Sequence, residues 1–236
     1  MSNAEALRRL HTSPPLLVLP NAWDVASARL FAGLPGCRAI ATSSAAVARS
    51  LGWDDGEQTP RDEMLQVVER IVAAVEVPVT SDLEAGYGDP PGTAAAAVAA
   101  GAAGMNLEDS RDGSLLSVDE QVEIVRAVRA AAPALVVNAR VDVFLAGDGD
   151  VGEAVERANA YLAAGADCAY PIAAPFDAIA PLVAGIDGPV NVLVDPANPR
   201  LQELERLGVV RVTFGSGLAR AALAEAAALA GQALAA

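Results

Sequence analysis

Short β-rich runs alternate with amphipathic, alanine-rich stretches along the whole chain, which is typical of βα units that share a parallel sheet. The predicted strands lie at 16–21, 38–43, 77–82, 104–108, 135–140, 167–170, 189–193 and 210–213. The helical patterns lie at 24–33, 60–75, 92–101, 117–132, 150–164, 175–184, 199–207 and 217–235. Eight such units close a barrel more economically than an open sheet, and a barrel usually needs about 250 residues. The 236 residues are therefore predicted to form one (β/α)8 barrel, a TIM barrel, with 1–236 as a single domain.

The composition limits the partners and the cellular compartment that are expected for such a barrel. The formal charge of −14 argues against nucleic acid and against anionic membrane surfaces as partners. No apolar run reaches the roughly 18 residues of a membrane span, and the N-terminus lacks the apolar core of a signal peptide. The two cysteines, Cys37 and Cys168, lie far apart, which favours neither a disulfide framework nor a zinc site. We therefore expect a cytoplasmic enzyme.

Two residue types that are absent or nearly absent exclude several kinds of chemistry. All 16 basic residues are arginine, so the chain has no side-chain amine for a Schiff base. This excludes lysine aldolases and lysine-anchored pyridoxal phosphate enzymes. The single histidine, His11, cannot supply a multi-histidine metal site, and it lies in a polar N-terminal segment that does not suggest a Ser-His-Asp triad. Catalysis would therefore depend on carboxylates, arginine, hydroxyls, amides, backbone dipoles, a thiol or a metal.

Charged side chains follow three neighbouring predicted strands, at the points where these strands end. A barrel carries its chemistry on the loops that follow its strands. Asp82 ends the third predicted strand, Glu84 lies two residues beyond it, and Glu108 ends the fourth. Side chains two positions apart share a face of a strand, so Asp82 and Glu84 are expected to face the barrel mouth. Arg140 ends the fifth predicted strand, where it shares a face with Asp142.

Asp82, Glu84 and Glu108 would meet at one end of the barrel. Like charges that are crowded together are costly unless a cation neutralises them or their pKa values rise. A hard divalent ion with oxygen ligands, Mg²⁺ or Mn²⁺, satisfies such an arrangement. We therefore predict a metal site formed by these three carboxylates. The alternative for each carboxylate is a solvated loop residue or a helix cap.

Arg140 would lie beside this metal site. Its guanidinium is suited to bind a substrate carboxylate through a bidentate pair. The alternative is a structural ion pair with Asp109 or Asp142. Cys37 and Cys168 are predicted to be buried small residues rather than nucleophiles.

Six segments spread over most of the chain carry a specific pattern. They are LPNAWDVASARL (19–30), TSSAAVARSLGWDDG (42–56), DLEAGYGD (82–89), GAAGMNLEDS (101–110), NARVD (138–142) and GVVRVTFGSGLARAA (208–222). In these segments the chain resembles the phosphoenolpyruvate mutase/isocitrate lyase superfamily, from about Leu17 to about Arg220. The most specific part is the pair DLEAGYG and NLEDS, in this order and on successive predicted strands.

The resemblance implies a role for several carboxylates. Asp82 matches the family's metal-ligating aspartate, and Glu84 stands where many members have a second aspartate. Glu108 corresponds to another residue of the metal shell, partly through water. Asp55 aligns with an aspartate near metal and substrate. We count Asp55, Glu108 and Arg140 as the candidate catalytic residues.

The resemblance also implies a substrate-binding set. Thr42, Ser43 and Ser44 occupy the segment that holds the substrate carboxylate or phosphonate in the family. Arg140 matches the substrate-binding arginine, and Asn191 lies where members have a polar active-site residue. Trp23 is added to this set, because it can line the mouth, although it can instead cover the rim.

The resemblance breaks down in the loop after the fourth predicted strand. The lyases and mutases carry a Lys-Lys/Arg-Cys-Gly motif there, whereas this short relative has Ser110-Arg111-Asp112-Gly113-Ser114-Leu115-Leu116. Cleavage of isocitrate or methylisocitrate by a loop cysteine is therefore not expected. The retained parts bind a 2-oxo acid and stabilise an enolate next to a metal.

Three hypotheses for the function follow. The leading one is a Mg²⁺-dependent lyase that acts on a small 2-oxo or 2-hydroxy (di)carboxylic acid, by C–C cleavage or decarboxylation through an enolate. The second is phosphoenolpyruvate or phosphonopyruvate chemistry at the P–C bond, with Arg111 in place of the lost lysine. The third is a non-catalytic 2-oxo acid binding protein. Each of the three has a small carboxylic acid as its partner.

The terminal stretch 217–235 is apolar nearly all round. Such a helix is more easily buried between subunits than against one barrel. The resemblance implies the same, because family members pack their last helix against a neighbouring barrel. We therefore predict a homodimer or homotetramer with this helix at the subunit interface.

Overall fold

Eight parallel strands close a barrel in the computed structural model, which describes residues 1–12 and 14–235. They are β1 (Leu17–Leu19) with β2 (Asn21–Ala22), β3 (Ile40–Thr42), β4 (Val79–Asp82), β5 (Gly104–Leu107), β8 (Val136–Val141), β9 (Cys168–Pro171), β10 (Asn191–Leu193) and β11 (Arg211–Thr213). The pairing runs β2-β3-β4-β5-β8-β9, and an isolated bridge from Ala169 to Val190 leads on to β10, β11 and β1. The predicted barrel is confirmed.

The first barrel strand is split into β1 and β2 at Pro20. Proline has no backbone N–H and cannot donate to a neighbouring strand. Its carbonyl still accepts a hydrogen bond from Ala41 N at 3.0 Å. As a result, β1 pairs with β11 and β2 pairs with β3, so the two halves together close the barrel.

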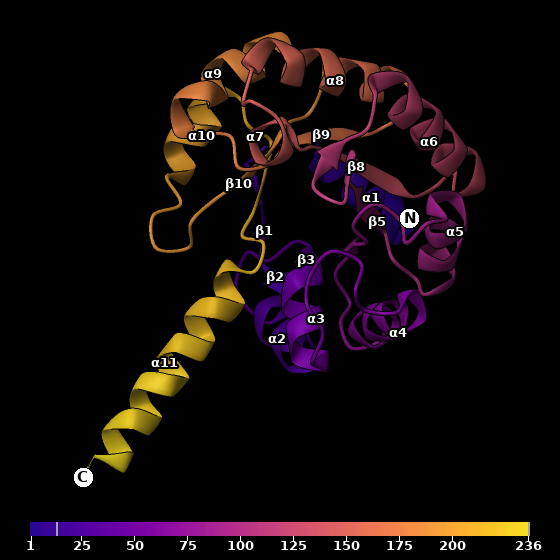
Figure 1. Ribbon diagram of the computed structural model, residues 1–236. Coiled ribbons are helices and arrows are strands. Elements are labelled where there is room, and N and C mark those ends of the chain that lie inside the picture. The colour runs from indigo at the N-terminus through magenta and orange to yellow at the C-terminus, as the bar shows by residue number, and fades with distance from the viewer. Residues whose placement is uncertain (13, 236) are drawn as a thin grey trace.

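The helices form a ring around the strands (Figure 1). At the predicted positions they are α2 (Val25–Ala32), α4 (Arg61–Val72), α5 (Pro90–Ala99), α6 (Val118–Ala131), α8 (Val151–Ala163), α9 (Phe176–Gly185), α10 (Leu201–Leu207) and α11 (Gly217–Leu234). The main core lies between strands and helices, where Met64, Ile71, Met105 and Tyr161 are fully buried. Since each strand is covered on both sides, nearly all of its residues are buried, including polar ones such as Thr80, Asn138 and Arg211.

Four further elements are not predicted by the sequence pattern. They are α1 (Asn3–Leu10), α3 (Ser44–Leu51), α7 (Val143–Ala146) and the hairpin of β6 (Ser110–Arg111) with β7 (Ser114–Leu115). Helix α1 closes the N-terminal end of the barrel, because its only buried residue, Leu7, packs with Leu17 and Val136. Arg8 fixes the helix there through an ion pair with Asp167, Nε to Oδ1 at 2.7 Å.

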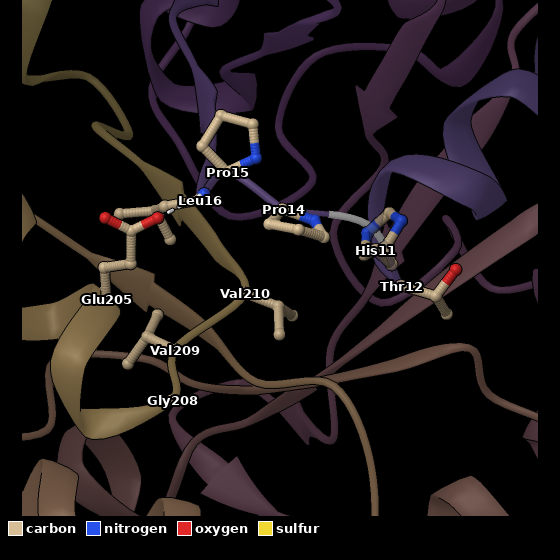
Figure 2. A pocket seen from close by; sticks show the side chains of 9 residues that line it. All are labelled: His11, Thr12, Pro14, Pro15, Leu16, Glu205, Gly208, Val209 and Val210. Carbon is tan, nitrogen blue, oxygen red and sulfur yellow. Dashed lines mark hydrogen bonds between the residues drawn. The ribbon is translucent and has the colours of Figure 1, made fainter.

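His11 and Arg211 form a buried pair at this end of the barrel. His11 Nδ1 lies 2.8 Å from the carbonyl of Leu7, so Nδ1 carries the proton and Nε2 accepts from Arg211 Nη1 at 3.3 Å. Figure 2 shows His11 on one side of a cavity of about 270 Å³ and Glu205 of α10 on the other. This cavity lies at the N-terminal ends of β1 and β11, opposite the end where the predicted site lies.

Helix α11 projects away from the ring of helices (Figure 1). Beyond Ala219 its residues are exposed, including Leu223 at 58% and Leu229 at 56%. Within the described part of the chain, no helix is both long and apolar enough to cross a membrane.

Candidate active site

Asp82 lies at the carboxyl end of β4 and accepts hydrogen bonds from the start of helix α3 and from the neighbouring strand β5. Its Oδ2 accepts from Ser44 N at 3.0 Å and from Ser44 Oγ at 2.9 Å. Its Oδ1 accepts from Asn106 Nδ2 at 3.1 Å, and its own N–H donates to Thr42 Oγ1 at 2.8 Å. Ser44 is the first residue of α3, so the positive end of the helix dipole favours the Asp82 carboxylate.

Asp55 joins this group through Ser44. The Ser44 hydroxyl lies 3.4 Å from Asp55 Oδ1 and also donates to Asp82. Burial and the negative charge of Asp82 raise the pKa of Asp55. The structure thus brings together Thr42, Ser44, Asp55 and Asp82, which the sequence predicted as parts of one site.

Glu84 is held in place by its neighbours in the loop after β4. Its Oε1 accepts from the Tyr87 hydroxyl at 2.8 Å, and its Oε2 accepts from Glu57 N at 2.6 Å. In return, Tyr87 N donates to the carboxylate of Glu57. All three residues have left-handed backbones, with φ of 51° at Glu84, 55° at Tyr87 and 59° at Glu57. Such strain in linked non-glycine residues is typical of functional loops.

Burial raises the pKa of Glu84 to about 7, and the negative charges of Asp82 and Asp55 act in the same direction. The hydrogen bonds from Tyr87 and Glu57 oppose this shift. Glu57 is a residue that the sequence analysis missed. Its contact depends on a local loop conformation, and the sequence carries no periodic signal for it.

Glu108 and Arg140 are in direct contact at the ends of β5 and β8. Arg140 Nη1 donates to Glu108 Oε1, while Nε and Nη2 donate to Asp142 Oδ1 and Oδ2 at 2.6 Å and 2.7 Å. Burial raises the pKa of Glu108 well above its usual value, with Arg140 opposing the shift and Asp82 adding to it. The structural ion pair with Asp142, considered from the sequence, is therefore present.

Arg140 nevertheless keeps part of its binding capacity. A guanidinium has five N–H donors, and three are occupied by Glu108 and Asp142. Two N–H groups remain for a substrate oxygen. The other candidate partner, Asp109, is bound elsewhere: it accepts from Tyr161 Oη and Asp142 N, both at 2.8 Å.

The side chains of three residues of the predicted site make their contacts with residues other than the carboxylates around Asp82. Ser43 caps α3, with its Oγ 3.4 Å from Ala46 N. Trp23 packs edge-to-face on Phe31 with ring centroids 6.1 Å apart. Asn191 is fully buried inside the barrel, and its Nδ2 donates to Thr213 at 3.3 Å. The role of these three residues in substrate binding stays a prediction.

The donor chemistry of the cluster fits a hard divalent cation. Asp55, Glu84 and Glu108 all have raised pKa values, partly because of the Asp82 charge, and a cation would relieve this repulsion. As the side chains stand, the described residues form no set of three or more acidic, histidine or cysteine groups that could hold an ion. Mg²⁺, however, usually keeps several waters and takes one or two protein carboxylates together with substrate oxygens.

A cavity of about 220 Å³ opens beside the carboxylates. Glu57 lies on the loop after β3, Glu84 follows β4, and Glu108, Ser110 and Arg111 follow β5. The cavity is therefore enclosed by the loops at the carboxyl ends of three adjacent strands. Active sites of (β/α)8 barrels lie at this end of the fold.

Comparison with known proteins gives a consistent result. The family model described as phosphoenolpyruvate phosphomutase matches residues 7–234. An uncharacterised protein of Mycobacterium tuberculosis is 37% identical over 210 residues, which cover 88% of this chain and 80% of that protein. An oxaloacetate decarboxylase of Ectopseudomonas mendocina is 32% identical over 228 residues, which cover 89% of this chain and 77% of that protein.

Solved structures are similar over nearly the whole chain. A proposed phosphonomutase from Burkholderia cenocepacia has 40% identity and a TM-score of 0.92, covering 97% of this chain and 99% of that one. A phosphonopyruvate hydrolase in complex with oxalate and Mg²⁺ has 27% identity and a TM-score of 0.87, covering 98% of this chain and 87% of that one.

Proposed function

The chain belongs to the phosphoenolpyruvate mutase/isocitrate lyase superfamily, and we propose that it is a Mg²⁺-dependent lyase for a small 2-oxo or 2-hydroxy (di)carboxylic acid. The reaction would be C–C cleavage or decarboxylation. The observation that carries the proposal is the position of Asp82, which Ser44 and Asn106 hold at the barrel mouth among three other acidic side chains. The similar oxaloacetate decarboxylase and the Mg²⁺–oxalate complex of a similar hydrolase support it.

Asp82, Glu84 and Glu108 are the residues that would hold the ion, with Mn²⁺ as the alternative metal. Both oxygens of Glu84 already accept hydrogen bonds, so Glu84 would act through water. When bound, the ion would supply Lewis-acid stabilisation of the negative charge that develops on an enolate. Asp55, which lies next to the Ser44 hydroxyl, would complete the set of acidic residues around the ion.

The protein would bind the acid through groups that surround these carboxylates. The hydroxyl of Thr42, which accepts from Asp82 N, keeps its own hydrogen to donate to a carboxylate, and the N-terminus of α3 adds a positive dipole. The two remaining N–H groups of Arg140 provide a charged donor. Ser110 lines the cavity, and because its hydroxyl donates to Asp142, we assign the delivery of the final proton to a water that its oxygen would bind.

Chemistry at a P–C bond is the second candidate, and one observation favours it. Arg111 lines the cavity, and its Nε is buried without a hydrogen-bond partner. A free guanidinium is a good ligand for a phosphonate. Phosphonopyruvate therefore belongs in any substrate screen.

The proposal is tested by proton NMR of the purified protein with Mg²⁺ and a panel of 2-oxo and 2-hydroxy acids that includes phosphonopyruvate. We expect turnover of at least one acid, with loss of turnover in EDTA and in Asp82→Asn. Binding shown by line broadening without any product would favour the non-catalytic binding protein. If the protein neither binds nor converts any acid of the panel, both the lyase hypothesis and the binding-protein hypothesis are contradicted.

A further inference from the structure

A row of three polar side chains runs across the barrel from β8 to β4. Asp82, Asn106 and Asn138 are register partners on the adjacent strands β4, β5 and β8. Register partners on neighbouring parallel strands project from the same face of the sheet, so the three side chains lie side by side. Asn138 Nδ2 donates to Asn106 Oδ1 at 2.7 Å, and Asn106 Nδ2 donates to Asp82 Oδ1 at 3.1 Å. The row therefore links a fully buried amide to the proposed metal ligand.

The direction of both hydrogen bonds follows from the carboxylate at the end of the row. An ionised carboxylate can only accept, so Asn106 must turn its NH₂ group towards Asp82. The amide oxygen of Asn106 then faces Asn138, which must donate in turn. If the Asn106 amide were turned over, its oxygen would face the carboxylate, and its NH₂ group would face the NH₂ group of Asn138. Asn138 therefore holds Asn106 in the one orientation that allows it to donate to Asp82.

The Asn138 side chain is poorly satisfied in every other respect. It is fully buried, and its Oδ1 has no hydrogen-bond partner among the described residues. A buried acceptor without a partner lowers the stability of a fold, and an apolar side chain at the same position would avoid this loss. Local departures of this kind are expected at functional positions. The contact with Asn106 is therefore the observation that accounts for an amide at this place in the barrel.

Asn106 contacts the oxygen of Asp82 that has room for a metal ion. Each carboxylate oxygen offers about two acceptor positions. Oδ2 uses both for Ser44, with the backbone N–H at 3.0 Å and the hydroxyl at 2.9 Å. Oδ1 accepts one hydrogen bond from the described residues, which comes from Asn106. The second acceptor position of Oδ1 is therefore the one that can face an ion.

We propose that Asn138 is a positioning residue for the metal site, which acts on Asp82 through the amide of Asn106. Hydrogen bonds to a ligating carboxylate fix its orientation and contribute to metal affinity. This inference rests on the proposed function of the site. It adds that metal affinity depends on a fully buried residue of β8, which lies two hydrogen bonds away from the carboxylate that would hold the ion.

The test measures the affinity for Mn²⁺, because the binding of this ion can be followed without any turnover. Free Mn²⁺ is determined from its electron paramagnetic resonance signal in titrations of the wild type, Asn138→Leu, Asn106→Leu and the double variant. Leucine branches at the same atom as asparagine and has no polar group. Asn138→Ala is included in case the larger leucine prevents folding, and circular dichroism checks the fold of each variant.

The matched control is Thr80→Val. Thr80 lies two residues before Asp82 on the same face of β4. It is buried like Asn138, and its hydroxyl has no hydrogen-bond partner among the described residues. The control therefore removes a buried polar group from the same part of the barrel without touching the row.

We expect Asn106→Leu to weaken Mn²⁺ binding by about 10- to 100-fold, the range for a lost hydrogen bond to a metal ligand. Asn138→Leu and Asn138→Ala should each weaken it by about 10-fold, because Asn138 acts through Asn106. The double variant should bind as weakly as Asn106→Leu alone, since the Asn138 contact then has no partner to act on. Thr80→Val should stay within about twofold of the wild type.

Four results would overturn the inference while the wild type still binds Mn²⁺ and the proposed function stays intact. One is wild-type affinity in a folded Asn138 variant. Another is a loss in the double variant equal to the product of the two single losses, which would mean that Asn138 acts independently of Asn106. The third is an equal loss in Thr80→Val, and the fourth is unfolding of both Asn138 variants, which would make the amide a requirement of the fold. Failure of the wild type to bind Mn²⁺ would instead contradict the proposed function, and this inference with it.

Discussion

Arg140 and Asp142 form a two-point ion pair across the end of β8, with Nε–Oδ1 at 2.6 Å and Nη2–Oδ2 at 2.7 Å. The Asp142 side chain is only 1% exposed, so Arg140 and Ser110, rather than water, compensate its charge. The pair fixes the plane of the guanidinium and therefore the direction of its two free N–H groups. Asp142 is in this sense a positioning residue for Arg140.

Asp142→Ala would leave Arg140 without its main partner in a buried setting. We expect the free energy of unfolding to fall by about 3–5 kcal/mol, the range for breaking a buried ion pair. Urea denaturation followed by circular dichroism measures the change. Asp187→Ala, which removes an exposed aspartate after α9, serves as the control. A loss no larger than in this control would show that the pair does not stabilise the barrel.

His11 predicts a dependence of stability on pH. Burial, assisted by the charge of Arg211, lowers its pKa from 6.5 to about 4. Between these values the unfolded chain binds a proton that the folded chain does not, so stability falls as the pH falls from 6.5 towards 4. The contribution is complete above pH 6.5 and amounts to at most about 3 kcal/mol.

The measurement is the free energy of unfolding from pH 7 to pH 4 for the wild type and His11→Gln. Other groups titrate in this range, but they are common to both proteins, so the difference isolates His11. We expect the wild type to lose more stability than the variant on acidification. Parallel curves would contradict a buried neutral histidine at this position.

The alternation of apolar strands and amphipathic helices was sufficient to predict the barrel, because each strand is buried on both faces. Helix α1 was missed because only Leu7 is buried in an otherwise polar segment. The split of the first strand at Pro20 could not be predicted either. It depends on which of the two neighbouring strands, β3 or β11, each half of the strand pairs with.

Within the site, residues at strand ends were predictable, since a parallel barrel brings these ends together. Asp82, Thr42 and Ser44 meet in this way. Glu57 was not predictable, because its contact with Glu84 depends on left-handed loop conformations that leave no periodic pattern. The role assigned to Asn191 depended on the resemblance to the family, whereas Trp23 was chosen because it could line the barrel mouth. In the structure, Trp23 packs on Phe31 and Asn191 donates to Thr213.

The exposed helix α11 predicts self-association. Its leucines Leu223 and Leu229 are more than half exposed, and burial of such a face between subunits removes apolar surface from water. We expect a dimer or tetramer by light scattering at micromolar concentration. The double variant Leu223→Glu/Leu229→Glu should shift the mass towards the monomer, whereas Glu225→Gln should not. A monomeric wild type would contradict the prediction.

The cysteines are expected to be dispensable for turnover. Cys168 is fully buried inside the barrel, and Cys37 lies beyond α2, beside a cavity formed with Phe31 and Phe214 rather than with the carboxylates. Cys37→Ala with Cys168→Ala should keep the activity found for the wild type. Loss of activity with an unchanged circular dichroism spectrum would indicate a cysteine-dependent lyase instead.

We propose that the carboxylates around Asp82 bind a divalent ion, which in turn binds a 2-oxo acid. Calorimetric titration of oxalate into the wild type, with Mg²⁺ and again with EDTA, tests it most directly, with Asp82→Ala as the variant. We expect oxalate binding by the wild type only with Mg²⁺, and a loss of at least about 100-fold in Asp82→Ala, as expected when a principal ligand is removed. Equal binding of oxalate in Mg²⁺ and in EDTA, or unchanged binding by Asp82→Ala, would contradict it.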